Sequence, residues 1–347
     1  MENLKKIIIY FIIISILLIQ AYPVIGDSFA VGDEDIYQGV PGYKGIQKNI
    51  SYKDVSNSWA KSSIYKLSAL GITNGKNGKF NPKAYLTKRQ VLESIGKTLG
   101  IQSLDYVEHF KKENIISKEE FDKIDTISEK TEKKIDDYIK KEVEKNKLSK
   151  EEEEKLRKAE REKYTWGKNA TREEVAAWLG RALKLTGKNP YMVNSFKDHN
   201  KFTQETKYII EAILQKGYMQ GFENGYFRPK HSITREQFAK TLDNALDDLL
   251  TLGDFKIKEG LISNIKKLNT IESQTSVTKK IFYMKNIDGT YPIIYTSKSN
   301  KPHLNKGFLV FKNGKLDLSD NLKPSDTIKY YIDIEGNIIY SEIADIY

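Results

Sequence analysis

The chain has 347 residues, of which 39% are hydrophobic and 30% charged, a length and composition typical of about two or three ordinary folded domains. It contains no cysteine, which excludes disulfides, thiolate metal sites and a cysteine nucleophile. The formal net charge of +10 would attract an anionic polymer, but it does not choose between nucleic acid, teichoic acid and an acidic polysaccharide.

Residues 1–30 have the form of a secretory signal peptide. Two lysines precede an apolar run from Ile7 to Ile19, and small residues offer cleavage after Gly26 or Ala30. The run is shorter than the about 20 apolar residues that a spanning helix needs, and an uncleaved anchor is the alternative. In either case we expect the rest of the chain to lie outside the cytoplasm.

The first folded unit is expected at residues 51–102, after a glycine-rich flexible linker at residues 31–50. Its pattern predicts a helix, a loop punctuated by glycines, and a second helix capped by Thr87. Its dissimilar residues return at matching positions later in the chain. These residues are Asp54, Trp59, Gly71, Gly75, Gly78, Phe80, Pro82 and Thr87.

The same layout recurs at residues 189–250. Gly217 stands where a left-handed residue would end the first helix, and Gly221 with Gly225 allows a tight loop. Thr234 is placed to cap the second helix, with Gln237 as its capping-box partner. Repeats of this size predict units that bury their apolar faces against one another.

A degenerate copy is expected between these two, at residues 103–188. Asn114 stands where a glycine ends the helix in the other copies, and Tyr164 and Trp166 stand where they have phenylalanine and proline. The two halves of this copy are separated by residues 117–163, which are dominated by lysine and glutamate.

This insertion is expected to form two or three helices in a charged hairpin. Two capping boxes support the helices, Ser117 with Glu120 and Ser149 with Glu152. Mixed charge at helical spacing is typical of a solvated surface, and an arm that docks a partner is the alternative.

Residues 251–347 have a different pattern. Short segments rich in β-branched and aromatic residues are separated by turn signals such as Asn313-Gly314. We predict about six short strands in a small antiparallel β barrel or sandwich, similar in its last hairpin to an OB- or SH3-like barrel. Modules of this kind bind saccharides, nucleic acids or proteins or act as spacers, and no residue pattern here chooses between these roles.

The recurring helical unit resembles the S-layer homology repeat, with its F-x-D opening, G-x-x-x-G loop, F-x-P turn and T-R-x-E helix start. In the third unit these elements are Phe196-Lys197-Asp198, Gly217 with Gly221, Phe227-Arg228-Pro229 and Thr234-Arg235-Glu236-Gln237. The resemblance implies an α-helical, pseudo-threefold bundle of three units. The expected fold is therefore multidomain α plus β, with a charged helical insertion and a carboxy-terminal β domain.

The resemblance further implies a secreted protein of the cell wall or S-layer. Such a protein is anchored without a covalent bond to a secondary cell-wall polysaccharide whose terminal sugar carries a pyruvate ketal. An arginine at a helix start offers a forked donor to a carboxylate, and the free N–H groups there favour an anion.

By motif position the cations are Arg172, Arg235 and Lys88, of which the lysine pairs only as a point charge. The arginines could instead pair with neighbouring carboxylates, and Asp54 and Asp198 could be N-caps of the first helices. For Trp59, packing is favoured over contact with a sugar. The remaining residues that the resemblance places at the polysaccharide grooves are Asp54, Asp198, Trp59, Gly71, Gly75, Gly217 and Gly221.

We expect no catalysis, metal, cofactor or nucleic-acid partner. The four histidines lack metal-ligand spacing, and the chain has no phosphate-binding loop, dinucleotide fingerprint or nucleophile elbow. Two alternatives to polysaccharide anchoring stay open. One is a structural S-layer-associated protein that acts through contacts with S-layer or other envelope proteins. The other is a hydrolase of cell-wall glycans.

Overall fold

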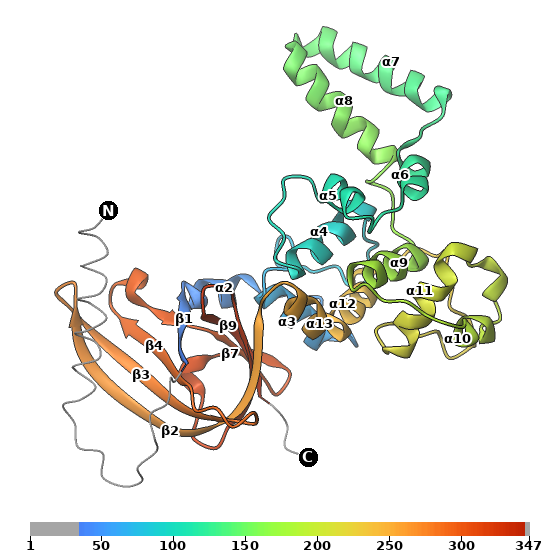
Figure 1. Ribbon diagram of the computed structural model, residues 1–347. Coiled ribbons are helices and arrows are strands. Elements are labelled where there is room, and N and C mark those ends of the chain that lie inside the picture. The colour runs from blue at the N-terminus through green and yellow to red at the C-terminus, as the bar shows by residue number, and fades with distance from the viewer. Residues whose placement is uncertain (1–34, 344–347) are drawn as a thin grey trace, which may run out of the picture. The chain divides into compact units, whose positions relative to one another are not determined.

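The computed structural model describes residues 35–343 (Figure 1). The expected signal peptide lies outside these residues. The described part contains both helices and a β-sheet, so the expected α plus β class is confirmed. Among residues 35–343, no helix is both long and apolar enough to cross a membrane.

The segment expected to be a flexible linker, residues 31–50, is structured from Ile36 onward, so that expectation is wrong there. It contains the strand β1 (Ile36–Pro41) and the helix α2 (Tyr43–Asn49). Gly39 allows close packing, because a Cβ there would lie 2.5 Å from the backbone of Gly307. Only a residue without a side chain fits between these two strands.

Each clear repeat folds as a helix, a loop and a second helix. Gly71 and Gly217 take φ of 72° just after the first helices and end them in the expected left-handed conformation. The helices of the first repeat are α3 (Lys61–Ala69) and α4 (Lys88–Thr98). Those of the third are α10 (Tyr191–Ser195), the short η1 (His199–Lys201), α11 (Gln204–Gln215), α12 (Arg235–Asn244) and α13 (Leu246–Leu252).

The middle unit follows the same plan with a long interruption. Asn114 has φ of 55° and replaces the helix-ending glycine, as expected. The flanking helices are α5 (Tyr106–Lys112) and α9 (Arg172–Ala182). The insertion forms α6 (Lys118–Asp125), α7 (Glu129–Asn146) and α8 (Lys150–Tyr164), with both expected capping boxes present. Figure 1 shows α7 and α8 side by side as a hairpin.

The strands form one sheet that closes on itself. β1 pairs with both β4 and β9, the two ends of the run β4-β3-β2-β8-β9, so the ring is complete. The remaining elements are β2 (Lys256–Glu272), β3 (Thr275–Asn286), β4 (Ile293–Ser299), η2 (Pro302–Leu304), β5 (Lys306–Gly307), β6 (Leu309–Lys312), β7 (Lys315–Leu318), η3 (Ser319–Asn321), β8 (Thr327–Ile332) and β9 (Asn337–Ile343).

The sheet is mixed, so the expectation of an antiparallel arrangement is wrong in part. β1 runs parallel to β4 and β9, and β6 runs parallel to β9. Tight turns join neighbouring strands and force antiparallel pairing, whereas β1 arrives from a distant part of the chain and is free of that constraint. The β domain therefore consists of residues from both sides of the helical region.

The helical repeats and the barrel share a buried core. Leu309, Tyr331 and Tyr340 of the barrel belong to the same apolar cluster as the helices of the repeats. Polar contacts follow this boundary, because Lys66 of α3 pairs with Asp243 of α12 at 2.8 Å and with Glu342 of β9. The barrel also has a second apolar core made of its own residues, which include Phe282.

Candidate functional site

Three helix starts stand at the centre of the helical region. Thr87, Thr171 and Thr234 cap α4, α9 and α12, and each accepts a hydrogen bond from the backbone three residues on. The side chain at that third position completes a capping box in all three helices. The expected caps are therefore confirmed.

The residue before each cap joins a closed ring of backbone hydrogen bonds. Leu86 N donates to Ile233 O at 3.3 Å, Ile233 N to Ala170 O at 3.0 Å, and Ala170 N to Leu86 O at 2.8 Å. Each helix start is thus fixed to the other two. As a result, the first side chain of each helix is directed across the boundary to a neighbouring repeat.

Two of these first side chains are arginines, and both hold the loop of the neighbouring repeat. Arg172 donates from Nε to Phe227 O at 2.9 Å and from Nη2 to Gln220 O at 2.8 Å. Arg235 donates in the same way to Phe80 O at 2.8 Å and Asn74 O at 2.6 Å. Each fork therefore binds backbone carbonyls, not the neighbouring carboxylate that we considered as an alternative.

Each of the two guanidinium groups also has a third nitrogen, Nη1. Within residues 35–343, Nη1 of Arg172 and Nη1 of Arg235 make no hydrogen bond or ion pair. Arg172 is only 5% exposed, and burial, followed by the nearby Arg228 charge, lowers its pKa from 12.5 to about 10. The side chain remains a cation at neutral pH, because its pKa still lies well above 7.

Lys88, the first side chain of α4, has a different environment. It is buried and forms an ion pair with Glu174, the capping-box glutamate of α9. This lysine is therefore neutralised by the chain itself.

The carboxylates of Asp54 and Asp198 fix the F-x-P turns by accepting backbone hydrogen bonds. Asp198 accepts hydrogen bonds from Phe227 N at 2.9 Å and Arg228 N at 2.8 Å. Asp54 accepts from Phe80 N and Asn81 N at 2.9 and 2.8 Å. Burial raises the pKa of Asp54, but these backbone hydrogen bonds outweigh it, and the net shift is downward. Both aspartates thus hold the loop of their own repeat.

The glycines of the G-x-x-x-G loops have two separate roles. Gly71 and Gly217 end helices with nothing packed where a Cβ would stand. A Cβ on Gly221 would lie 2.2 Å from the ring of Phe196, and one on Gly75 would lie 2.4 Å from the ring of Tyr52. The second glycine of each loop therefore leaves room for the aromatic residue that opens the repeat.

A groove of about 700 Å³ brings three of the expected site residues together. Trp59, Arg172 and Gly221 line it, although they come from three different repeats. Trp59 is 61% exposed, so the favoured expectation of a packing residue is wrong. The other lining residues are Tyr218, Met219, Gln220, Phe222, Glu223, Asn224, Arg228, Gln237, Lys240, Thr241 and Asn244.

The other expected residues lie outside this groove. Arg235, Asp54, Gly71 and Gly75 belong to the equivalent boundary between the third and first repeats, and Lys88 belongs to the boundary between the first and second. Sequence reasoning missed Arg228 and Lys240. The middle residue of Phe227-Arg228-Pro229 was treated as a variable position, and Lys240 carries no motif signal.

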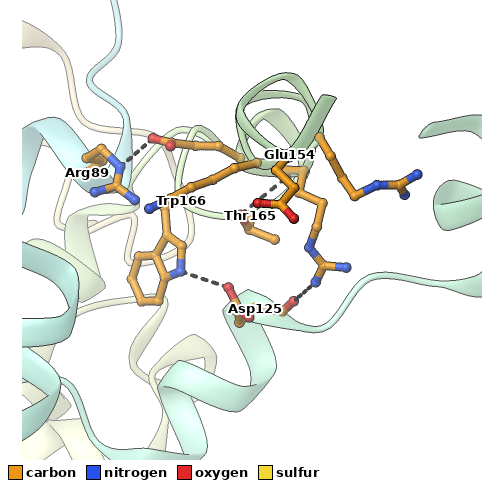
Figure 2. Close-up of a pocket in the computed structure, with 9 residues that line it drawn as sticks. Arg89, Asp125, Glu154, Thr165 and Trp166 are labelled. Atoms are coloured by element: carbon orange, nitrogen blue, oxygen red, sulfur yellow. Dashed lines mark hydrogen bonds and ion pairs between the residues drawn. The ribbon is translucent and has the colours of Figure 1, made fainter. Parts of the chain in front are cut away.

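A second pocket, of about 300 Å³, lies where the insertion meets α4 (Figure 2). Arg89 pairs there with Glu162 of α8, while the Trp166 indole donates to Asp125 at 3.1 Å. At the matching helix position, Glu173 pairs with Lys230 and Glu236 with Lys83, both at 2.5 Å. The insertion thus supplies an acidic partner at a boundary where the other repeats supply a lysine.

The described residues give no sign of a metal centre. Within residues 35–343, no group of three or more histidine, aspartate or glutamate side chains could hold an ion. The candidate site is therefore a set of fixed cations and an exposed indole around an open groove. Such an arrangement can bind an anionic ligand.

Comparisons with known proteins agree with the repeat pattern. The S-layer homology domain matches residues 51–92 and 195–239, which confirms the resemblance in these two segments. A curated relative, an endoglucanase from Bacillus sp. (strain KSM-635), is 33% identical over 82 residues. The match covers 22% of this chain and only 9% of the endoglucanase. The S-layer homology domain points to association with the cell surface.

Proposed function

Because two segments of this chain are S-layer homology domains, we propose that it is a non-catalytic envelope protein that binds a pyruvylated secondary cell-wall polysaccharide. The repeats would act as a pseudo-threefold bundle, for which the cyclic hydrogen bonds of Leu86, Ala170 and Ile233 give support. Secretion and a location in the cell wall or S-layer are parts of the same proposal.

The observation that carries the proposal is the groove at Arg172. A buried cation with one free guanidinium nitrogen stands beside an exposed indole in a groove of about 700 Å³. A pyruvate ketal offers a carboxylate for the guanidinium, and the sugar ring offers an apolar face for Trp59. Burial of the arginine strengthens such a contact because fewer water molecules screen it.

The two arginine boundaries should bind more strongly than the lysine boundary. Arg172 and Arg235 each keep a free nitrogen on a positioned fork, whereas Lys88 is already paired with Glu174. A charged hydrogen bond contributes about 1.5–3 kcal/mol, so losing one should weaken binding by roughly tenfold or more.

The test is calorimetric titration of the protein with pyruvylated wall polysaccharide. Arg172→Lys and Arg235→Lys keep the charge but remove the fork, and each should weaken binding by about tenfold. Lys88→Ala is the comparison variant: it removes a cation that Glu174 already neutralises, so it should weaken binding far less, with the melting temperature of each variant measured beside its affinity. The same polysaccharide with its ketals hydrolysed should bind poorly to every variant. Equal binding of both polysaccharides would sink the carboxylate proposal.

A further inference from the structure

Arg228 occupies a backbone position that does not suit an arginine. Its φ is 62°, in the left-handed region that residues with a side chain generally avoid. The equivalent residue of the first repeat is Asn81, with φ of 57°. Asparagine tolerates this conformation better than other residues with a side chain, so the arginine makes the turn less stable than asparagine would.

The Arg228 side chain offsets part of this cost through its contact with the Phe222 ring. Within residues 35–343 its guanidinium makes no hydrogen bond and no ion pair. It lies 4.2 Å from the ring centroid of Phe222, and the Arg172 guanidinium lies 4.7 Å from the same centroid. Both guanidinium groups thus contact one ring at the wall of the groove, and the Arg228 charge contributes to the lowered pKa of Arg172.

The charges around this pair are not balanced within the groove. Arg172, Arg228 and Lys240 line it, against the single carboxylate of Glu223 among its lining residues. Asp198 lies near Arg172, but both of its oxygens already accept backbone N–H groups. Two neighbouring guanidinium groups repel each other, and an anion between them would remove that repulsion.

We propose that Arg228 is a specificity-determining residue that binds an acidic substituent of the saccharide together with Arg172. This inference rests on the proposed function and goes beyond the T-R-x-E arginines. The substituent carries a carboxylate or a phosphate, since a pair of guanidinium groups suits either. At the boundary that Arg235 forms, Asn81 stands in the place of Arg228. An acidic substituent meets one arginine of this kind there, not two, and should therefore bind less strongly.

The decisive variant is Arg228→Asn, tested in the full chain. Asparagine suits the left-handed backbone, so the melting temperature should stay the same or rise. Binding to pyruvylated wall polysaccharide should weaken by about tenfold, and its dependence on salt should become less steep. Arg228→Lys keeps the charge and should recover part of the loss. Asn81→Arg is the reciprocal variant and should strengthen binding.

Binding to two wall polymers tests whether the recognised acidic group is a carboxylate or a phosphate. The first is pyruvylated polysaccharide before and after hydrolysis of its ketals, and the second is a phosphodiester-linked wall polymer. Arg228 should contribute to binding of whichever polymer carries the recognised group.

The outcomes separate this inference from the proposed function. If Arg172→Lys weakens binding and Arg228→Asn does not, the role of Arg228 is wrong while polysaccharide binding stands. If the unaltered protein binds neither polymer, both ideas are wrong. A stable Arg228→Asn protein with tenfold weaker binding supports the inference.

Discussion

The carboxylate of Asp54 holds the loop of the first repeat, and its lowered pKa makes that loop sensitive to acid. Asp54 accepts two backbone hydrogen bonds, and its pKa is lowered in the folded state. Stability from such a group is present above its ordinary pKa and is lost as the pH falls through the lowered value. The loop whose carbonyl groups accept hydrogen bonds from Arg235 should therefore become less stable in acid.

We predict that Asp54→Asn destabilises the protein at pH 7 by about 1–3 kcal/mol, because the amide is uncharged and has one acceptor oxygen, so its NH2 group faces the second backbone N–H. Urea denaturation measures the loss. Asp137→Asn, at an exposed position of α7, is the control and should change little. The gap between Asp54→Asn and the unaltered protein should narrow as the pH falls below 3.8, the ordinary aspartate pKa, and a gap that is independent of pH would contradict the charge argument.

At the residue scale, local rules in the sequence were informative and long-range contacts were not. The caps at Thr87 and Thr234 and the helix ends at Gly217 and Asn114 depend on neighbours within a few residues, so the sequence predicts them. The partners of the arginines are carbonyls in another repeat. No spacing rule links Arg235 to Asn74, because the three-way ring at the helix starts determines that meeting.

At the scale of elements, the insertion divides into a packed base and an outer hairpin. Phe121 of α6 is buried and lies 5.4 Å from the Trp166 ring, and Glu162 at the end of α8 pairs with Arg89. The hairpin beyond this base has little apolar surface, apart from Ile135 and Ile139 where α7 meets α8. The sequence predicted the charged helices but not that their base joins the core.

We predict that replacing residues 129–157 with a short glycine–serine bridge leaves the repeats folded. Asp125 and Arg161 are already in contact, so the bridge spans a small gap. Removing the whole of residues 117–163 also removes Phe121 and should cost about 3 kcal/mol or more. Thermal unfolding of both deletions tests this, and equal losses would show that the outer hairpin packs into the core.

The linker expectation failed at the same scale for a physical reason. Glycines in a segment indicate either flexibility or close approach, and sequence alone does not separate the two. Gly39 is a case of close approach, since Gly307 lies against it. The strands that pair with β1 lie far along the chain, so no local turn signal in the sequence predicts this strand.

At the scale of the molecule, the helical region is inserted into the barrel and does not precede it. The chain enters through β1 and α2, forms the repeats, and returns to the barrel at β2. α2 also contacts the barrel, since Gln47 donates to Leu316 O at 3.3 Å. The expected boundary, with a separate β domain at residues 251–347, therefore assigns β1 to the segment before the repeats although it belongs to the barrel.

We predict that residues 251–347 alone do not fold cooperatively, because β4 and β9 lack the strand that joins them. Residues 36–50 joined by a flexible linker to residues 253–347 should restore a sharp thermal transition. Circular dichroism on the two fragments compares them. A cooperative transition in the shorter fragment would mean that β1 is an accessory to the barrel and not a part of it.

The position of β1 also sets an order of events during synthesis. This strand is among the first of the described residues to be made, yet Ile36 pairs with Ile293 and Gln38 with Asn337. A growing chain that has not reached Ile293 contains neither partner, while the repeats between them are already complete. β1 therefore stays without these partners while the repeats are made, and the barrel closes only after β4 and β9 have been synthesised.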